Sequence, residues 1–190
     1  HTVKAPDFYA GKKGLSAAER GTAVHTVLEH MDFGKKYSYD DIKELIAGCL
    51  ERGILTQAEA DSVSVKKIQI FASCDLYKRI LEADDVFKEE AFTVAVRPGE
   101  IYSQEKYKDI DGDIILHGRI DCYFIENGGI VLIDYKTDRY NEDSEEEFHE
   151  RYDIQMELYS KALEKVTGLK VKECYIYSVE SGRAIPVEIQ

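Results

Sequence analysis

Two carboxylates and an ammonium group, Asp121, Asp134 and Lys136, form the constellation with the clearest chemical meaning. Carboxylates aimed at one point repel each other unless a cation lies between them, and a hard divalent metal with oxygen ligands is the simplest such cation. A neighbouring lysine orients a water or stabilises developing negative charge. Together these groups suit metal-assisted hydrolysis of a phosphodiester bond. The competing interpretation is a surface Asp–Lys pair. The apolar run of residues 131–133 argues against it, because an interior strand rarely ends in two charges.

A predicted β-hairpin brings the two aspartates together. Asn127-Gly128 is a strong turn signal because both residues tolerate positive φ, and the flanking residues 116–125 and 130–133 are β-branched, aromatic or apolar. With these two residues as the loop, Asp121 lies opposite Asp134, and alternation places Lys136 on the face of Asp134. A three-residue loop would instead shift the pairing by one and turn Asp121 to the other face.

Other polar side chains are candidates for the same site. His25 lies on a predicted helix beside an apolar stripe; it is either a packed histidine or, if that helix covers the hairpin, a metal ligand. Gly21, one turn earlier, permits close backbone approach. Gln155 and Tyr159 share a helix face, which is either half buried on the sheet or in contact with the phosphate backbone or the catalytic residues. Glu90 on a predicted strand is either a ligand or an edge charge, and we favour the edge charge.

The totals describe one soluble domain. We expect residues 1–13 to be a lead-in and residues 14–190 a single domain, with 44% hydrophobic and 33% charged residues. There is no apolar run of the ~20 residues that a membrane span needs, and no signal peptide. The four cysteines show no CxxC pair, so reduced thiols in a cytoplasmic protein are expected rather than a zinc knuckle or an iron–sulfur cluster. The net charge of −12 disfavours autonomous nucleic-acid binding but is compatible with a catalytic module whose substrate is delivered by another component.

The expected elements follow in the order helices, three strands, one helix, and one or two strands, which indicates a mixed sheet flanked by helices. We expect four helices. The first begins at the capping box Ser16-x-x-Glu19, and the second is capped by Asp40 and ends near Gly53. The third runs from the capping box Thr56-x-x-Glu59 to about Ala83 with a single break near Ser73, and the fourth follows the acidic segment 141–150 and ends at Gly168. Besides the hairpin, the expected strands are Val86–Val96, Val171–Val179 and Ala184–Ile189, with residues 98–112 as a polar loop.

Four motifs in series carry a family resemblance: Gly21-Thr22-Ala23-Val24-His25, Gly118-Arg119-Ile120-Asp121, Ile133-Asp134-Tyr135-Lys136-Thr137 and Gln155-x-x-x-Tyr159. Over roughly residues 15–180 the chain resembles the RecB-family nucleases of the PD-(D/E)XK superfamily, in particular the C-terminal nuclease domain of AddA-type helicase–nuclease proteins. Glu90-x-Phe92 is similar to the first core strand of that family, although an alanine stands where the family usually has a proline.

The resemblance implies an α/β fold with a restriction-endonuclease-like core, a central mixed sheet flanked by helices and a helical N-terminal part. It implies Mg²⁺, with Mn²⁺ as a possible substitute, and no iron–sulfur cluster. The implied roles are metal binding by His25, Asp121, Asp134 and the carbonyl of Tyr135, catalysis by Lys136, and support of the site by Gln155 and Tyr159.

The resemblance also implies partners. The substrate would be a DNA strand fed from a helicase motor, expected to be the 3′-terminated one, during double-strand-break processing before recombination. No membrane is involved, and the expected protein partner is an AddB-like subunit. The chain has no GxxxxGK[ST] motif, so ATP would be used only by a helicase part elsewhere. Two alternatives stay open: a stand-alone RecB-like exonuclease of another subfamily, and a non-catalytic DNA-binding module with the same fold.

Overall fold

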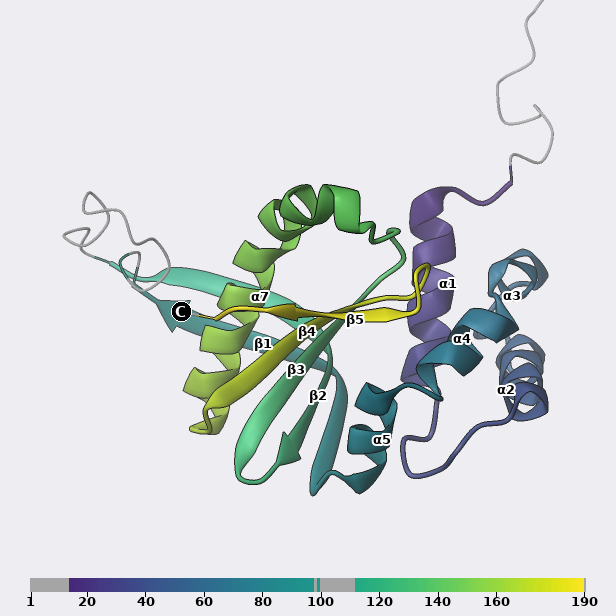
Figure 1. Cartoon of the computed structure of the whole chain (residues 1–190), viewed down its shortest axis with the longest axis horizontal. Helices are drawn as coiled ribbons and strands as arrows, with labels where there is room; N and C mark the ends of the chain where they lie inside the picture. The colour runs from purple at the N-terminus through teal and green to yellow at the C-terminus, as the bar shows by residue number, and fades with distance from the viewer. Residues whose placement is uncertain (1–13, 98, 100–111, 190) are drawn as a thin grey trace, which may run out of the picture.

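A five-stranded mixed sheet with the strand order β1-β2-β3-β4-β5 forms the centre of the chain (Figure 1). The computed structural model of the protein describes residues 14–97, 99 and 112–189, so the predicted lead-in and most of the predicted polar loop lie outside the described residues. Neighbouring strands are antiparallel except β3 and β4, which are parallel. The predicted α/β class with a mixed sheet is therefore confirmed. The strands are β1 (Asp85–Val96), β2 (Ile114–Glu126), β3 (Gly129–Lys136), β4 (Val171–Ser178) and β5 (Arg183–Val187).

The β2–β3 hairpin has the predicted two-residue turn. Asn127 and Gly128 have φ values of 51° and 72°, as this turn type requires. The strands pair from Glu126 with Gly129 to Cys122 with Ile133, so the predicted register is confirmed and the three-residue loop is wrong.

Strands β2 and β3 separate immediately beyond that last pair. β3 continues to Lys136 along β4, while β2 continues along β1. Asp121 and Asp134 are the first residues past the separation. The backbone N–H of Tyr135 donates to Asp121 Oδ2 at 2.7 Å, so a side chain takes the place of the missing strand partner.

The N-terminal part is helical, as predicted, with α1 (Ala17–Glu29), α2 (Tyr39–Glu51), α3 (Gln57–Ser62), α4 (Val65–Phe71) and α5 (Asp75–Glu82). The capping boxes at Ser16 and Thr56 are both present. Two predictions are wrong. Helix α2 is capped by Ser38, which exchanges hydrogen bonds with Asp41, so Asp40 lies inside the first turn. The third helical stretch is broken twice, because extended backbone at Val63 also interrupts it.

The long helix α7 (Glu145–Thr167) follows a short 3-10 turn, η3 (Glu142–Ser144). It begins within the acidic segment rather than after it, since glutamates in a first turn are favoured by the helix dipole. Gly168, with φ of 72°, follows its end as predicted.

The two faces of the sheet bury separate cores. Helices α1 to α5 pack on one face, with Cys122, Phe124 and Ile133 of the hairpin, and α7 packs on the other, with Ile130 and Leu132 (Figure 1). Strand β3 is thus buried on both sides, as its apolar run predicted. None of the helices in the described part of the chain combines the length and apolarity needed to cross a membrane.

Candidate functional site

Helix α1 lies close against the strand ends that carry the predicted site. A Cβ atom at Gly21 would lie 3.3 Å from Thr137 Oγ1, so the small residue allows the close approach that the sequence indicated. At the other end of the helix, Lys88 Nζ of β1 donates to the carbonyls of Glu29, at 2.6 Å, and Met31. These contacts hold α1 beside the hairpin, which is the arrangement that the ligand interpretation of His25 requires.

His25 faces Asp121 directly, with Nδ1 3.4 Å from Oδ1. Burial lowers the pKa of His25. The hydrogen bond to Asp121 and the negative charges of Asp121, Asp134 and Glu89 raise it by more than burial lowers it, so the net pKa lies above the ordinary 6.5. The imidazole therefore lies in a strongly negative environment.

Asp134 is buried at the opposite side of the site, with a side chain that is 3% exposed. Lys136 Nζ lies 2.6 Å from its Oδ2 as an ion-pair partner, although Oδ2 accepts no geometrically sound hydrogen bond from the described residues. Gln155 of α7 bridges the pair: Lys136 Nζ donates to Gln155 Oε1 at 3.0 Å, and Gln155 Nε2 donates to Asp134 Oδ1 at 3.3 Å. Lys136 thus shares the face of Asp134, as predicted.

The two aspartates repel each other. Burial, and then the charge of Asp121, raise the pKa of Asp134 from 3.8 to about 6, while Lys136 and His25 oppose the rise. Asp121 therefore lies near enough to Asp134 for its charge to raise that pKa, and the binding of one metal by both carboxylates stays a prediction.

Tyr152 is a neighbour of the site that the sequence analysis did not select. Lys136 Nζ lies 5.0 Å from the centre of its ring. Tyr152 precedes Gln155 by three residues on α7, so helical spacing is the signal that would have identified it.

Tyr135 and Tyr159 serve as packing residues in this structure. The ring of Tyr135 is buried against Phe71 on the α1–α5 side, 5.3 Å between ring centres. Tyr159 packs edge-on against Phe92 at 5.5 Å, and a Cβ atom at Gly118 would lie 3.4 Å from its Cε1. The structure thus places Tyr159 under the glycine of the Gly118–Asp121 motif and not among the carboxylates.

A third acidic side chain, Glu89, joins the site and was missed by the sequence analysis. One ligand atom from each of His25, Glu89 and Asp121 lies within 4.8 Å of the others. The β1–β2 register places Glu89 opposite Asp121, and only knowledge of that long-range pairing would have identified it. Glu90 is exposed on the edge strand β1, in agreement with the favoured interpretation of it as an edge charge.

These donors fit a hard divalent cation. The set contains an imidazole nitrogen and the carboxylates of Glu89 and Asp121, and the Asp134 carboxylate, which is paired with Lys136, lies near enough to interact with them. A cation between the carboxylates would remove the repulsion between Asp121 and Asp134.

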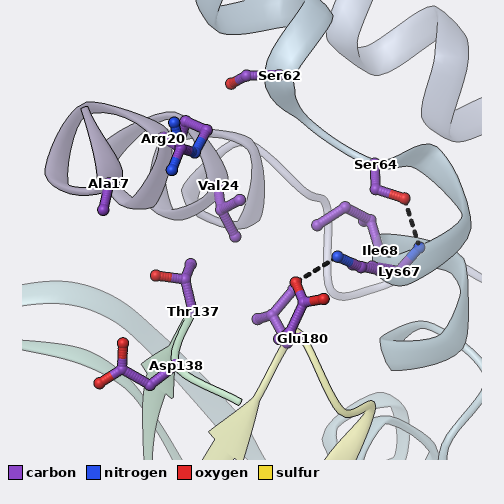
Figure 2. A pocket seen from close by; sticks show the side chains of 11 residues that line it. Ala17, Arg20, Val24, Ser62, Ser64, Lys67, Ile68, Thr137, Asp138 and Glu180 are labelled. Atoms are coloured by element: carbon purple, nitrogen blue, oxygen red, sulfur yellow. Dashed lines mark hydrogen bonds and ion pairs between the residues drawn. The ribbon is translucent and has the colours of Figure 1, made fainter. Parts of the chain in front are cut away.

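A cavity of about 270 Å³ lies next to this site, between α1, α4 and the loops after β3 and β4 (Figure 2). Its lining includes Arg20, Thr137 and Asp138, and Lys67 in it is paired with Glu180. Asp121, Asp134 and Lys136 do not line the cavity; the lining residue nearest to Lys136 along the chain is Thr137, directly after β3.

The five-stranded mixed sheet with helices on both faces is the α/β fold of a nuclease domain, and the chain belongs to the PD-(D/E)XK nuclease superfamily, whose family description matches residues 3–187. Its relatives are large proteins, each named as the A-type subunit of an ATP-dependent helicase/nuclease. The chain is 44% identical over 183 residues to the one from Thermoanaerobacter sp. (strain X514), covering 96% of this chain and 15% of that protein. It is 40% identical over 185 residues to the one from Ruminiclostridium cellulolyticum (97% and 14%), and 39% identical over 189 residues to the one from Clostridium acetobutylicum (98% and 15%). The chain therefore spans about one seventh of the length of these relatives.

Proposed function

We propose that this chain is the Mg²⁺-dependent nuclease domain of an ATP-dependent helicase/nuclease and hydrolyses phosphodiester bonds in a single DNA strand. The observation that carries the proposal is the meeting of Asp121, Asp134, Lys136 and His25 where β2 and β3 separate. The names of the relatives support the proposal.

Asp121, Asp134, His25 and the carbonyl of Tyr135 would hold Mg²⁺, with Mn²⁺ as a substitute. When bound, the ion would neutralise phosphate charge and lower the pKa of a water. The hydrogen bond from the Tyr135 N–H fixes Asp121 at the point where the strands separate, so this carboxylate is oriented before any ligand arrives.

Lys136 would stabilise the charge that develops on the phosphate or orient the attacking water. Gln155 accepts a hydrogen bond from the ammonium group with its amide oxygen and donates one to Asp134 with its amide nitrogen, so a single side chain holds both partners of the ion pair. Tyr159 would support the site indirectly, by packing under the strand that carries Asp121.

The wider setting is also part of the proposal. A helicase part, which alone would use ATP, would deliver the strand, and an AddB-like subunit would be its partner in double-strand-break processing in the cytoplasm. Exonucleolytic cleavage in the 3′→5′ direction is expected. A net charge of −12 suits a domain that does not grip DNA by itself.

A cleavage assay tests this proposal. The chain is incubated with single-stranded DNA labelled at the 5′ end, with Mg²⁺ or with EDTA. We expect progressive shortening of the labelled strand with Mg²⁺ and none with EDTA. Asp134→Ala should abolish this shortening, whereas the control Asp143→Ala, which alters an exposed carboxylate elsewhere, should retain it. Retarded DNA without any shortened product would refute the nuclease and favour the binding module.

A further inference from the structure

We propose that Glu89 is an additional carboxylate ligand of the divalent cation and closes the site from the side of β1, together with His25 and Asp121. This inference rests on the metal-dependent function proposed above. The observation that points to Glu89 is its position in the structure.

The backbone of β1 reverses its alternation at Glu89. Side chains an odd number of residues apart in a strand point to opposite faces, yet Phe87 and Phe92 both pack in the core under α7. The reversal occurs at Glu89, whose φ of 53° lies in the left-handed region that a residue with a side chain rarely adopts. As a result, Lys88 and Glu89 are consecutive but both reach helix α1.

Strand β2 reverses its alternation at the same level. Ile120 and Tyr123 are three residues apart and both pack in the core under α7. Asp121 lies between them, opposite Glu89, because the flanking pairs are Lys88 with Cys122 and Glu90 with Ile120. Both strands are thus distorted at one level, and this level is where the two carboxylates face His25.

The positive charge near Glu89 comes from Arg119 and, when it is protonated, from His25. The Glu89 side chain is 15% exposed, and Arg119, whose Nη1 lies 3.5 Å from Oε2, is itself 61% exposed. An exposed arginine screens a buried carboxylate weakly, so the carboxylate pair remains unfavourable until a cation joins it.

A further acidic side chain, Asp134 of β3, lies near this cluster. Its carboxylate is paired with Lys136, whose Nζ lies 2.6 Å from Oδ2, and its charge interacts with those of Asp121 and His25. The negative charges of Glu89, Asp121 and Asp134 therefore all act on His25. If Glu89 were only an ion-pair partner of His25 and Arg119, its loss would change stability but not the affinity for metal.

The test is a Mn²⁺ titration of the whole chain, followed by electron paramagnetic resonance of the free ion, so the readout does not depend on cleavage. We expect Glu89→Gln to weaken Mn²⁺ binding roughly 10–100-fold. The matched control is Glu90→Gln, which removes the adjacent, exposed charge and should change the affinity less than about twofold. Glu89→Gly adds a second variant that accepts positive φ without strain, so it should fold, with an affinity as weak as that of Glu89→Gln.

The outcomes separate the two proposals. If the parent chain binds no Mn²⁺, both the metal-dependent function and the role of Glu89 are wrong. If the parent binds and Glu89→Gln and Glu89→Gly bind equally well, only the role of Glu89 is wrong. Equal weakening in Glu90→Gln would also overturn it, because the effect would then be one of general charge.

Discussion

Replacing Asp134 by asparagine should stabilise the metal-free protein while abolishing cleavage. The side chain keeps its shape but loses the charge that burial and Asp121 disfavour. A group that is required for activity and unfavourable for folding is expected where a site is built to bind a cation.

The size of the effect follows from the pKa of Asp134. The difference between 3.8 and about 6 corresponds to on the order of 3 kcal/mol at 1.36 kcal/mol for each pKa unit. This value already includes the favourable charge of Lys136. In the Asp134→Asn variant, however, Lys136 loses its nearest negative partner, which offsets part of the gain. We therefore expect a gain of about 1–3 kcal/mol, or roughly 3–10 °C in Tm for a chain of this size.

The pH dependence has a defined sign. Well below pH 3.8 the carboxyl is protonated in both the folded and unfolded states, so it carries no penalty. Between pH 3.8 and about 6 the unfolded state loses its proton first, so the stability of the parent falls as pH rises through this window. Above pH 6 the penalty is constant.

The assay is thermal unfolding in EDTA at pH 4 and pH 7.5, with Asp143→Asn as an exposed control. The advantage of Asp134→Asn should be present at pH 7.5, much smaller at pH 4, and reduced when Mg²⁺ stabilises the parent. A variant that melts below the parent in EDTA at pH 7.5 would refute the reasoning and make Asp134 a structural residue.

Three further predictions concern the neighbours of this carboxylate and a distant ion pair. Lys136→Ala should lower the cleavage rate by roughly 10²–10³-fold with Mn²⁺ affinity changed by less than about threefold, and equal losses would show that its role is misassigned. Gln155→Ala should slow cleavage by roughly 10–100-fold through loss of the bridge between Lys136 and Asp134, and an unchanged rate in single-turnover measurements would contradict this. Arg79 makes paired hydrogen bonds to Glu126, and Arg79 together with Lys172 lowers the pKa of Glu126 from 4.5 to about 2. Arg79→Ala should therefore lower stability by about 1–2 kcal/mol at pH 7, and this difference should shrink as pH falls from 4.5 to 2. A pH-independent difference would exclude the ion pair as its cause.

Short-range signals predicted the hairpin and most helix ends. Asn127-Gly128 set the turn, and the turn set the register through which Asp121 and Asp134 meet. The capping boxes at Ser16 and Thr56 were also correct, because each depends on residues three positions apart.

Competing local signals caused the errors in the helices. Asp40 and Ser38 are both good capping residues, and the structure uses Ser38 because Asp41 completes its capping box. A second break near Val63 followed no glycine or proline and was not visible in the pattern of apolar residues.

Glu89 was missed for a different reason. Its inclusion depends on the pairing of β1 with β2 and on a left-handed backbone at a residue other than glycine. Such a conformation is disfavoured locally by about 1–2 kcal/mol, so only the surrounding structure enforces it. No residue pattern within β1 predicts this left-handed conformation.

The separation of β2 from β3 also has a consequence for when the domain becomes dangerous to nucleic acid. The groups that meet there come from α1, two hairpin strands and α7, so most of the chain has to leave the ribosome before they assemble. An incomplete polypeptide that ends before α7 lacks the Gln155 amide, which hydrogen-bonds to both Lys136 and Asp134. Under the proposed function, cleavage would therefore begin only after α7 has been synthesised and has packed on the sheet.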